Sequence, residues 1–321
     1  MGGSGGNDRT SGRIPVIVIG GPTASGKTSL AVSLALELGA EIISADSRQL
    51  FRSLRIGTAR PSDEEMKGVP HHLSGIIELG QRYTVFDYVK DAQRLIGEIA
   101  ARGRRTIICG GTGLYLRALI EGIFEIPDDD FLYRQEMIDL AAREGPAVLH
   151  KMLAQVDPGE AEKIHPNNLV KVIRALEIFR ITGRTKSYWT ENQTPPEQWF
   201  RFLQLILMPD RAQLYDRINN RVDQMIRQGL VEEARGVYNS PDREALRQCK
   251  IVGYEELIEC FADRLPLESA IEAIKQNTRR FAKRQYTWFR GMRRAEFIEG
   301  FGGEVLNRCR GVCLAFLDVN I

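Results

Sequence analysis

The stretch Gly20–Thr28, GGPTASGKT, decides the fold. It follows the apolar, β-branched segment Ile14–Gly20 and precedes Ser29–Leu38, whose apolar residues recur at helical spacing. A strand, a glycine-rich turn with the pattern G-x-x-x-x-G-K-[ST] and a helix are typical of a phosphate-binding loop. Glycines let backbone N–H groups point inward, Lys27 reaches terminal phosphate oxygens, and the Thr28 hydroxyl can ligate Mg²⁺. The predicted phosphate-binding residues are Gly21, Pro22, Thr23, Ala24, Ser25, Gly26, Lys27 and Thr28.

The loop alone does not reveal whether the bound phosphates belong to a nucleotide such as ATP or to another diphosphate. Its structural alternative is a glycine turn that binds nothing. Two more strand-sized segments, Glu41–Ala45 and Thr106–Cys109, flank an amphipathic helical stretch at Val85–Arg102. Strands that alternate with helices predict an α/β fold, in which helices cover both faces of a parallel sheet.

The middle of the chain changes to helical periodicity. Helices are expected at Phe131–Arg143, Ala147–Gln155 and Leu169–Ile181, a core strand at Phe202–Met208, and two further helices at Arg211–Gln228 and Leu267–Phe289. We therefore predict a disordered glycine- and serine-rich leader at 1–12, a core at 13–126 and 200–300, an all-helical insertion at 127–199, and a C-terminal tail at 301–321.

Composition excludes several classes of protein. With 321 residues, 43% hydrophobic and 27% charged, the chain resembles an ordinary globular protein, and its apolar runs are far too short to span a membrane. Five cysteines at irregular spacing argue against a disulfide framework and for a reducing compartment, so we expect a cytoplasmic protein. Cys309 and Cys313 alone do not predict a zinc site, because all four histidines lie far upstream.

Polar residues follow two of the predicted strands. Asp46-Ser47-Arg48-Gln49 comes directly after the second strand, and Gly110–Gly113 follows the third. Since the carboxyl ends of parallel strands line the ligand crevice, Asp46 should face the substrate, where it would support Mg²⁺ through water or accept a proton. Thr112 would bond phosphate or base. The structural alternatives are a helix N-cap at Asp46 or Ser47 and a tight turn at the glycines.

A basic stretch lies near the C-terminus. From Ala273 to Ala295 there is no acidic residue. The cations there are Lys275, Arg279, Arg280, Lys283, Arg284, Arg290, Arg293 and Arg294. On a helix, Arg280 and Arg284 fall one turn apart, so one face is cationic. Such a run is often only a solvated surface, but the absence of acids favours a polyanionic partner.

Taken together, these segments resemble the tRNA dimethylallyltransferases, also called tRNA isopentenyltransferases. The similarity runs from about Ile14 to Arg290. The matching stretches, in order, are GGPTASGKT, DSRQLF from Asp46, IGTARP from Ile56, GGTGLY from Gly110, HPNN from His165, RALE from Arg174, VGY from Val252 and AKRQYTWFR from Ala282.

The resemblance implies a P-loop-kinase-like core that binds dimethylallyl diphosphate with Mg²⁺ at Thr28, and an insertion that grips the tRNA anticodon stem-loop. The acceptor in this family is N6 of the adenosine immediately 3′ of the anticodon. Asp46 corresponds to the general base, with Lys27, Thr112 and Lys250 as further catalytic residues. The implied tRNA contacts are Asp46, Ser47, Arg48, Gln49, Thr112, Arg134, Val170, Lys171, Val172, Ile173, Arg174, Arg280, Phe281, Ala282, Lys283, Arg284 and Gln285.

The chain also departs from the family pattern. Glu255 stands where a basic residue is expected after Gly-Tyr, and Lys250 takes the place of an arginine that contacts diphosphate in some members. Three rival functions use the same loop: an isopentenyltransferase acting on free adenine nucleotides, a small-molecule kinase, and a nucleotide-regulated binding protein. The insertion and the basic helix favour the tRNA enzyme, and we expect it to act as a monomer.

Overall fold

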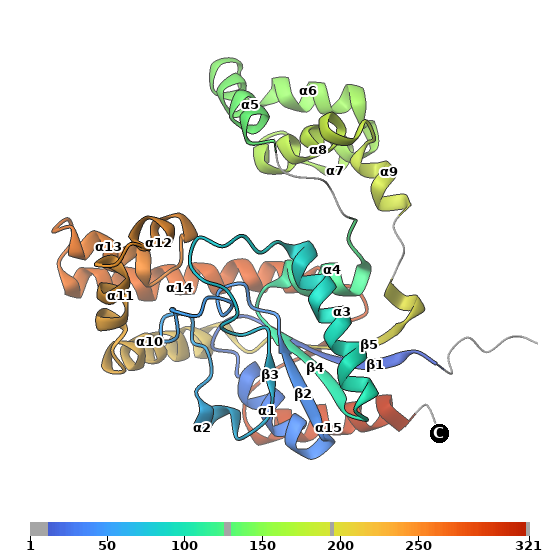
Figure 1. Ribbon diagram of the computed structural model, residues 1–321, viewed down its shortest axis with the longest axis vertical. Helices are drawn as coiled ribbons and strands as arrows, with labels where there is room; N and C mark the ends of the chain where they lie inside the picture. Colours follow the sequence, from blue (N-terminus) through green and yellow to red (C-terminus); the bar gives the residue numbers. More distant parts are fainter. Residues whose placement is uncertain (1–11, 125–129, 193–195, 319–321) are drawn as a thin grey trace, which may run out of the picture. The chain divides into compact units, whose positions relative to one another are not determined.

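Among the described residues, six parallel strands form the sheet of the larger of two units, which comprises residues up to Ile120 and from Pro196 onward. The structure, a computed structural model, describes residues 12–124, 130–192 and 196–318, so nearly all of the predicted leader lies outside the described residues. The strand order is β3-β2-β4-β1-β5-β6 (Figure 1). The strands are β1 (Ile14–Gly20), β2 (Ala40–Ser44), β3 (His71–His72), β4 (Arg105–Gly110), β5 (Phe200–Leu207) and β6 (Glu296–Ile298). The predicted parallel α/β sheet is confirmed.

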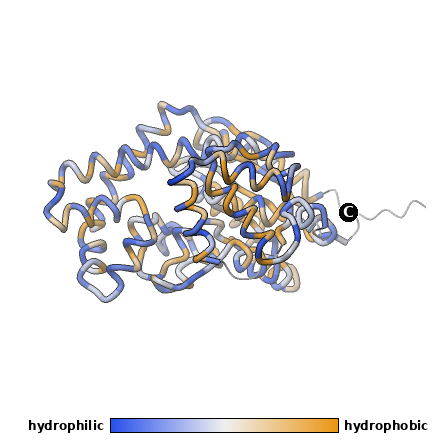
Figure 2. The backbone as a smooth tube through the Cα atoms, turned by 90° about the horizontal axis from the view of Figure 1, so that it is seen from above, coloured by the Kyte–Doolittle hydropathy of each residue, from blue (hydrophilic) through white to orange (hydrophobic). Residues whose placement is uncertain are grey.

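Helices cover both faces of the sheet, because its central strands carry apolar residues on both sides. On one face, α1 (Lys27–Leu38) and α15 (Gly303–Asp318) pack against Ile17, Ile42 and neighbouring apolar residues. On the other face lie α3 (Val85–Ala101) and α4 (Gly113–Glu121). Hydrophobic stretches gather inside this part of the chain, and the outer helices alternate in hydropathy (Figure 2).

The segment after β5 contains more helices than the sequence predicted. The predicted pair appears as α10 (Arg211–Arg227) and α14 (Leu267–Arg290). Between them lie α11 (Leu230–Tyr238), α12 (Arg243–Cys249) and α13 (Tyr254–Phe261), and a short α2 (Asp63–Met66) precedes β3. No helix among the described residues is long and apolar enough to cross a membrane.

The C-terminal segment belongs to the core. Residues 301–321 were set apart as a tail, but α15 occupies 303–318 and buries Val305, Cys309 and Cys313 in the apolar cluster beneath the sheet. The expectation of a tail is therefore corrected: apolar residues at helical spacing give this segment a buried face. Burial raises the pKa of Cys309 to about 11 and that of Cys313 to about 12.

The inserted unit, Glu121–Pro195, is built from helices alone within the part that the structure describes. They are α5 (Phe131–Glu144), α6 (Pro146–Val156), α7 (Pro158–Lys163), α8 (Leu169–Thr182) and α9 (Lys186–Glu191). Leu149, Leu153 and Val172 lie at its core, each fully buried. Residues 196–199, which the sequence placed in the insertion, join the core instead, because the Trp199 carbonyl accepts a hydrogen bond of 2.9 Å from Ile14 N.

Candidate active site

The phosphate loop joins the end of β1 to the start of α1. Gly26 adopts φ 88° directly before the helix, a left-handed conformation that favours glycine. Gly21 lies so close to β5 that a Cβ atom there would approach Leu207 O within 2.8 Å. A larger side chain would therefore be sterically unfavourable at both positions. With α1 beginning at Lys27, the N–H groups of its first turn are free to bind an anion.

Two polar groups of the loop suit an anionic ligand. The Ser25 hydroxyl is buried and has no hydrogen-bond partner among the described residues. Lys27 Nζ donates to Pro22 O at 3.1 Å, and burial lowers the pKa of this ammonium, an effect that Asp46 opposes. A diphosphate would supply the Ser25 hydroxyl with an acceptor oxygen and Lys27 with further ones.

The two polar loops that the sequence singled out lie together at the carboxyl edge of the sheet. Thr112 Oγ1 accepts a hydrogen bond of 2.9 Å from Ser47 N, and Thr112 N donates to Ala45 O at 3.0 Å. Asp46 Oδ1 accepts from Arg48 N at 3.0 Å. Thr112 thus holds the turn that carries Asp46, a positioning role that the sequence did not foresee.

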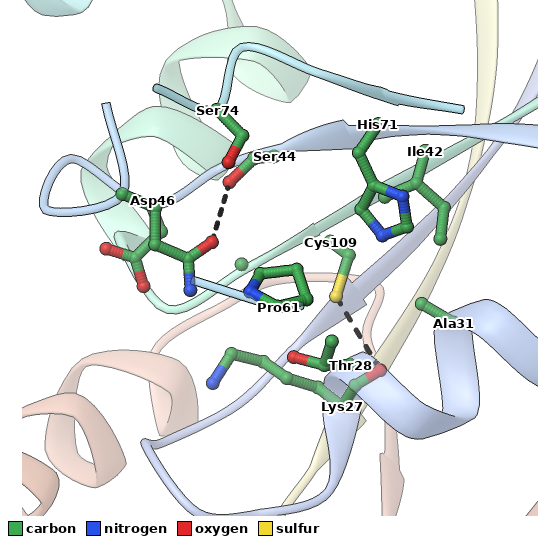
Figure 3. A pocket seen from close by; sticks show the side chains of 12 residues that line it. Lys27, Thr28, Ala31, Ile42, Ser44, Asp46, Pro61, His71, Ser74 and Cys109 are labelled. Atoms are coloured by element: carbon green, nitrogen blue, oxygen red, sulfur yellow. Dashed lines mark hydrogen bonds between the residues drawn. The ribbon is translucent and has the colours of Figure 1, made fainter. Parts of the chain in front are cut away.

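One pocket contains both the phosphate loop and the carboxylate (Figure 3). Lys27 and Thr28 approach from α1, and Asp46 from the end of β2. The remaining lining residues are Ala31, Ile42, Ser44, Gln49, Pro61, His71, Ser74, Cys109 and Gly110. The structure therefore brings together four of the predicted site residues, Lys27, Thr28, Asp46 and Gln49, with apolar walls beside them.

Helix α10 adds two arginines that the sequence analysis missed. Arg217 Nε donates to Ala24 O at 3.0 Å, within the phosphate loop. Burial lowers the pKa of Arg221, and the charge of Asp46 opposes this shift. The charge of Arg221 in turn lowers the pKa of Lys27. Arg217 and Arg221 lie one helical turn apart, and this spacing was the only sequence signal that they share a face of α10. Nothing in the local sequence relates that face to the phosphate loop, which lies far upstream.

A loop that follows Asp46 is anchored by a single carboxylate. Glu233 accepts hydrogen bonds from the backbone N–H groups of Arg55, Ile56 and Gly57 at 2.8–3.1 Å, and from the Tyr254 hydroxyl at 2.5 Å. Gly57 packs on the buried Tyr254 ring, and a Cβ atom at position 57 would lie only 2.4 Å from the Cε2 atom of that ring. These contacts hold the loop that brings Pro61 to the pocket.

Several predicted tRNA contacts are buried instead. Gln285 on α14 accepts from Thr23 N at 2.8 Å and donates to Gly111 O at 2.9 Å, so it bridges the two glycine loops. The residue is only 7% exposed, and its tRNA contact stays a prediction. Ala282, Val172 and Ile173 are likewise buried, in the apolar cores of their units, and their tRNA contacts stay predictions.

The cationic face of α14 is exposed. Arg280, Lys283 and Arg284 are solvent-accessible, and no carboxylate among the described residues pairs with any of them. Arg279 differs, because it bonds Asn219 Oδ1 at 2.5 Å and lies partly buried. The face is therefore available for a polyanion, as the charge pattern predicted.

Lys250 is exposed at the end of α12, in a left-handed conformation with φ 46°. The preceding carbonyl, Cys249 O, accepts a hydrogen bond of 2.7 Å from Arg48, the residue two positions after Asp46. The contacts of the phosphate loop described above come from α10 and α14. The diphosphate contact of Lys250 stays a prediction.

In the inserted unit, two predicted tRNA-binding arginines meet at a buried acid. Glu177 is fully buried and accepts hydrogen bonds from Arg134 at 2.8–2.9 Å, from Arg174 at 2.5 Å and from Asp130 N at 2.9 Å. Val170 and Lys171 are exposed, Val170 at 81%. Glu177 therefore fixes the two guanidinium groups and occupies part of their hydrogen-bonding capacity.

Removal of this acid should loosen the insertion. We expect Glu177→Ala to destabilise the inserted unit by about 2 kcal/mol, less than a fully buried ion pair would lose, because both guanidinium groups keep partial access to water. Hydrogen exchange of α5 and α8 measures the change. Glu136→Ala, which removes an exposed glutamate from α5, is the control. Equal protection in the two variants would contradict the prediction.

Comparisons with known proteins agree with this geometry. The family model described as IPP transferase matches residues 49–292. The tRNA dimethylallyltransferase of Geobacter metallireducens is 44% identical over 275 residues, which cover 86% of this chain and 89% of the relative. That of Carboxydothermus hydrogenoformans is 42% identical over 307 residues, covering 95% and 98%.

Solved structures show the same similarity. The full-length tRNA isopentenylpyrophosphate transferase of Bacillus halodurans aligns with a TM-score of 0.70 at 37% identity and covers 96% of this chain and 98% of its own. A eukaryotic dimethylallyltransferase acting on tRNA aligns with a TM-score of 0.80 at 26% identity, covering 96% of this chain and 80% of its own.

Proposed function

Because the chain belongs to the IPP transferase family, we propose that it transfers a dimethylallyl group from dimethylallyl diphosphate to N6 of the adenosine 3′ of the anticodon in tRNA. The observation that carries this proposal is the single pocket shared by Lys27, Thr28 and Asp46. A phosphate loop suits a diphosphate leaving group, and a carboxylate beside it suits a nucleophile that must lose a proton.

Asp46 acts as the general base. One of its oxygens accepts from Arg48 N, and the other has no hydrogen bond among the described residues. An exocyclic adenine amine is a weak nucleophile because its lone pair is delocalised. As N6 forms its bond to the allylic carbon, the carboxylate takes the N6 proton and the carbon–oxygen bond to diphosphate breaks.

The phosphate loop stabilises the charge that develops on the leaving group. Lys27 and the N–H groups at the start of α1 supply positive charge in this region, and the charge of Arg221 lowers the pKa of Lys27. Because these groups are fixed by the fold, they need little reorganisation during the reaction. We assign Arg221 to diphosphate, a role that the sequence analysis gave to Lys250.

The residues present fit Mg²⁺. Thr28 and Asp46 offer oxygen ligands in one pocket, and no group of three or more His, Cys, Asp or Glu side chains among the described residues could hold a metal ion by itself. Mg²⁺ commonly keeps several waters and binds through one or two protein oxygens together with substrate phosphates. When bound through Thr28, the ion would neutralise charge on the diphosphate.

The exposed cations of α14 and Lys171 of the insertion bind the tRNA phosphate backbone. Arg280, Lys283 and Arg284 supply affinity without sequence choice, since phosphates carry no base identity. The free energy needed to flip the target adenosine out of the base stack is lower in a loop than in a duplex. A free adenine nucleotide would not need these surfaces.

The acceptor decides between this function and its rivals. The protein is incubated with labelled dimethylallyl diphosphate and, in separate reactions, with tRNA, AMP or ATP. We expect label in tRNA alone, on N6 of the adenosine 3′ of the anticodon. Label in AMP would instead support an enzyme of free nucleotides, and phosphorylation of a small molecule with ATP would support a kinase.

Changes in the phosphate loop should affect diphosphate and not ATP. We expect Lys27→Ala to weaken dimethylallyl diphosphate binding by about tenfold or more, because a charge-assisted contact is lost, and Thr28→Ala to raise the Mg²⁺ requirement. Added ATP should neither support nor be consumed in the reaction. Steady-state kinetics with varied diphosphate and Mg²⁺ measure both effects, and ATP hydrolysis coupled to turnover would refute the diphosphate assignment.

A further inference from the structure

One histidine in the pocket has no role in the function described so far. His71 lies in β3, and its Nδ1 is 2.8 Å from Val69 O. Because a carbonyl only accepts hydrogen bonds, Nδ1 must carry the proton. Burial and the neighbouring His72 lower the pKa of His71, which favours a neutral ring. Its other nitrogen, Nε2, is therefore a hydrogen-bond acceptor.

This acceptor lacks a donor. Nε2 is buried and has no hydrogen-bond partner among the described residues, although His71 lines the pocket that holds Lys27 and Thr28. A buried polar atom without a partner destabilises the folded state, so such atoms in native proteins usually meet a ligand or water. The nitrogen therefore indicates a donor that arrives with the bound ligands.

The register of the sheet places the ring beside α1. His71 pairs with Ile42, and both line the pocket together with Ala31 and Thr28. His72 alternates to the opposite face, where its Nε2 bonds Glu41 at 2.7 Å. Figure 3 shows His71 and Asp46 on opposite sides of the pocket, with Pro61 and Cys109 between them.

The chemistry of the possible ligands limits the donor. Phosphate oxygens only accept, so they do not suit an unprotonated nitrogen. The adenine amine is directed to Asp46, across the pocket. Water bound to Mg²⁺ is a strong donor, and the ion retains several such waters when it binds phosphates.

We propose that His71 Nε2 accepts a hydrogen bond from a water molecule on the Mg²⁺ ion that Thr28 ligates, and so orients the hydrated ion toward the diphosphate. The proposal rests on the proposed function for the presence of Mg²⁺ and diphosphate. His71 is then a positioning residue for the metal, supplied by the edge strand β3. Groups that orient a metal site in this way typically change its affinity by about 10–100-fold when replaced.

Two substitutions separate the ring nitrogens. In His71→Asn, the amide nitrogen can still donate to Val69 O, but nothing replaces Nε2. In His71→Gln, the longer side chain can place an acceptor near the position of Nε2. The control, His72→Asn, removes the bond to Glu41 from the same strand without reaching the pocket.

The measurement is the affinity for inorganic pyrophosphate by calorimetry, with Mg²⁺ and with chelator. In the wild type, Mg²⁺ should increase the affinity for pyrophosphate, and we expect this increase to be about tenfold smaller in His71→Asn. In His71→Gln and His72→Asn the increase should stay within about threefold of that in the wild type. Without Mg²⁺, all three should bind pyrophosphate like the wild type. The proposal would be overturned if Mg²⁺ increased the pyrophosphate affinity of His71→Asn as much as that of the wild type, or if His72→Asn showed the same reduction as His71→Asn. It would also be overturned if His71→Asn bound pyrophosphate more weakly than the wild type without Mg²⁺.

A measurement on the unaltered protein does not depend on how the variants fold. With ¹⁵N-labelled histidine, Mg²⁺ added to the pyrophosphate complex should shift the His71 Nε2 resonance and leave Nδ1 nearly unchanged. A constant Nε2 resonance would refute the contact. If the wild type binds no pyrophosphate at all, the proposed function fails with it; if it binds and only the His71 effects are missing, the proposed function stands.

Discussion

We expect Asp46→Asn to lower the kcat of prenyl transfer by about 100-fold or more while tRNA affinity changes little. Asparagine keeps an oxygen that can accept from Arg48 N, so the turn after β2 should survive. What it lacks is a group that can take the N6 proton. Single-turnover transfer to tRNA measures the chemical step, and a filter-binding titration measures the affinity.

The control for this substitution is Asp216→Asn, which removes an exposed carboxylate from α10. It should retain wild-type kcat. A near-normal kcat in Asp46→Asn would remove the carboxylate from the proton transfer, and the adenosine would then have to lose its proton to water or to the diphosphate.

The second large effect concerns salt. Replacing Arg280, Lys283 and Arg284 together by alanine should weaken tRNA binding and make its salt dependence shallower by about two to three units in log–log slope, because each phosphate contact contributes roughly 0.7–0.9. The three side chains are exposed without carboxylate partners among the described residues, so their charge is available. Dimethylallyl diphosphate binding should be nearly unchanged.

A control with the same change in net charge removes Lys67, Lys90 and Arg308, exposed cations outside α14. Its slope should stay within about half a unit of the wild type. Binding is titrated at several salt concentrations, and a thermal melt checks that both variants fold. An unchanged slope in the folded α14 variant would exclude this helix as a tRNA-binding surface.

The phosphate loop could be predicted because its signal is local. Strand, glycines and helix follow one another within Ile14–Leu38, and each glycine has a steric role within that stretch or against the adjacent β5. The same reasoning predicted that the loops carrying Asp46 and Thr112 would lie at one edge of the sheet, and there Thr112 accepts a hydrogen bond from Ser47 N. Long periodic helices such as α14 were also predicted to within a residue or two.

What the sequence could not provide were contacts between distant segments. Arg217 reaches the phosphate loop from α10, where it donates to Ala24 O, and Gln285 accepts from Thr23 N across 262 positions of the chain. The family resemblance placed Gln285 among the tRNA contacts, although it lies with Ala282 and Phe289 on the buried face of α14. The edge strands β3 and β6 have two and three residues, too short for any periodicity to appear.

The insertion separates β4 from β5 in the chain, and this affects the order in which the two units can fold during synthesis at the ribosome. β1 pairs with β5, and α15 closes one face, so the core needs strands and a helix made after the whole insertion. The insertion, in contrast, is one continuous segment, Glu121–Pro195. Since a nascent chain folds from units already complete, the insertion can form first while β1 still lacks its partner strand β5. Until the last residues emerge, the phosphate loop remains next to an exposed apolar edge that chaperones would recognise.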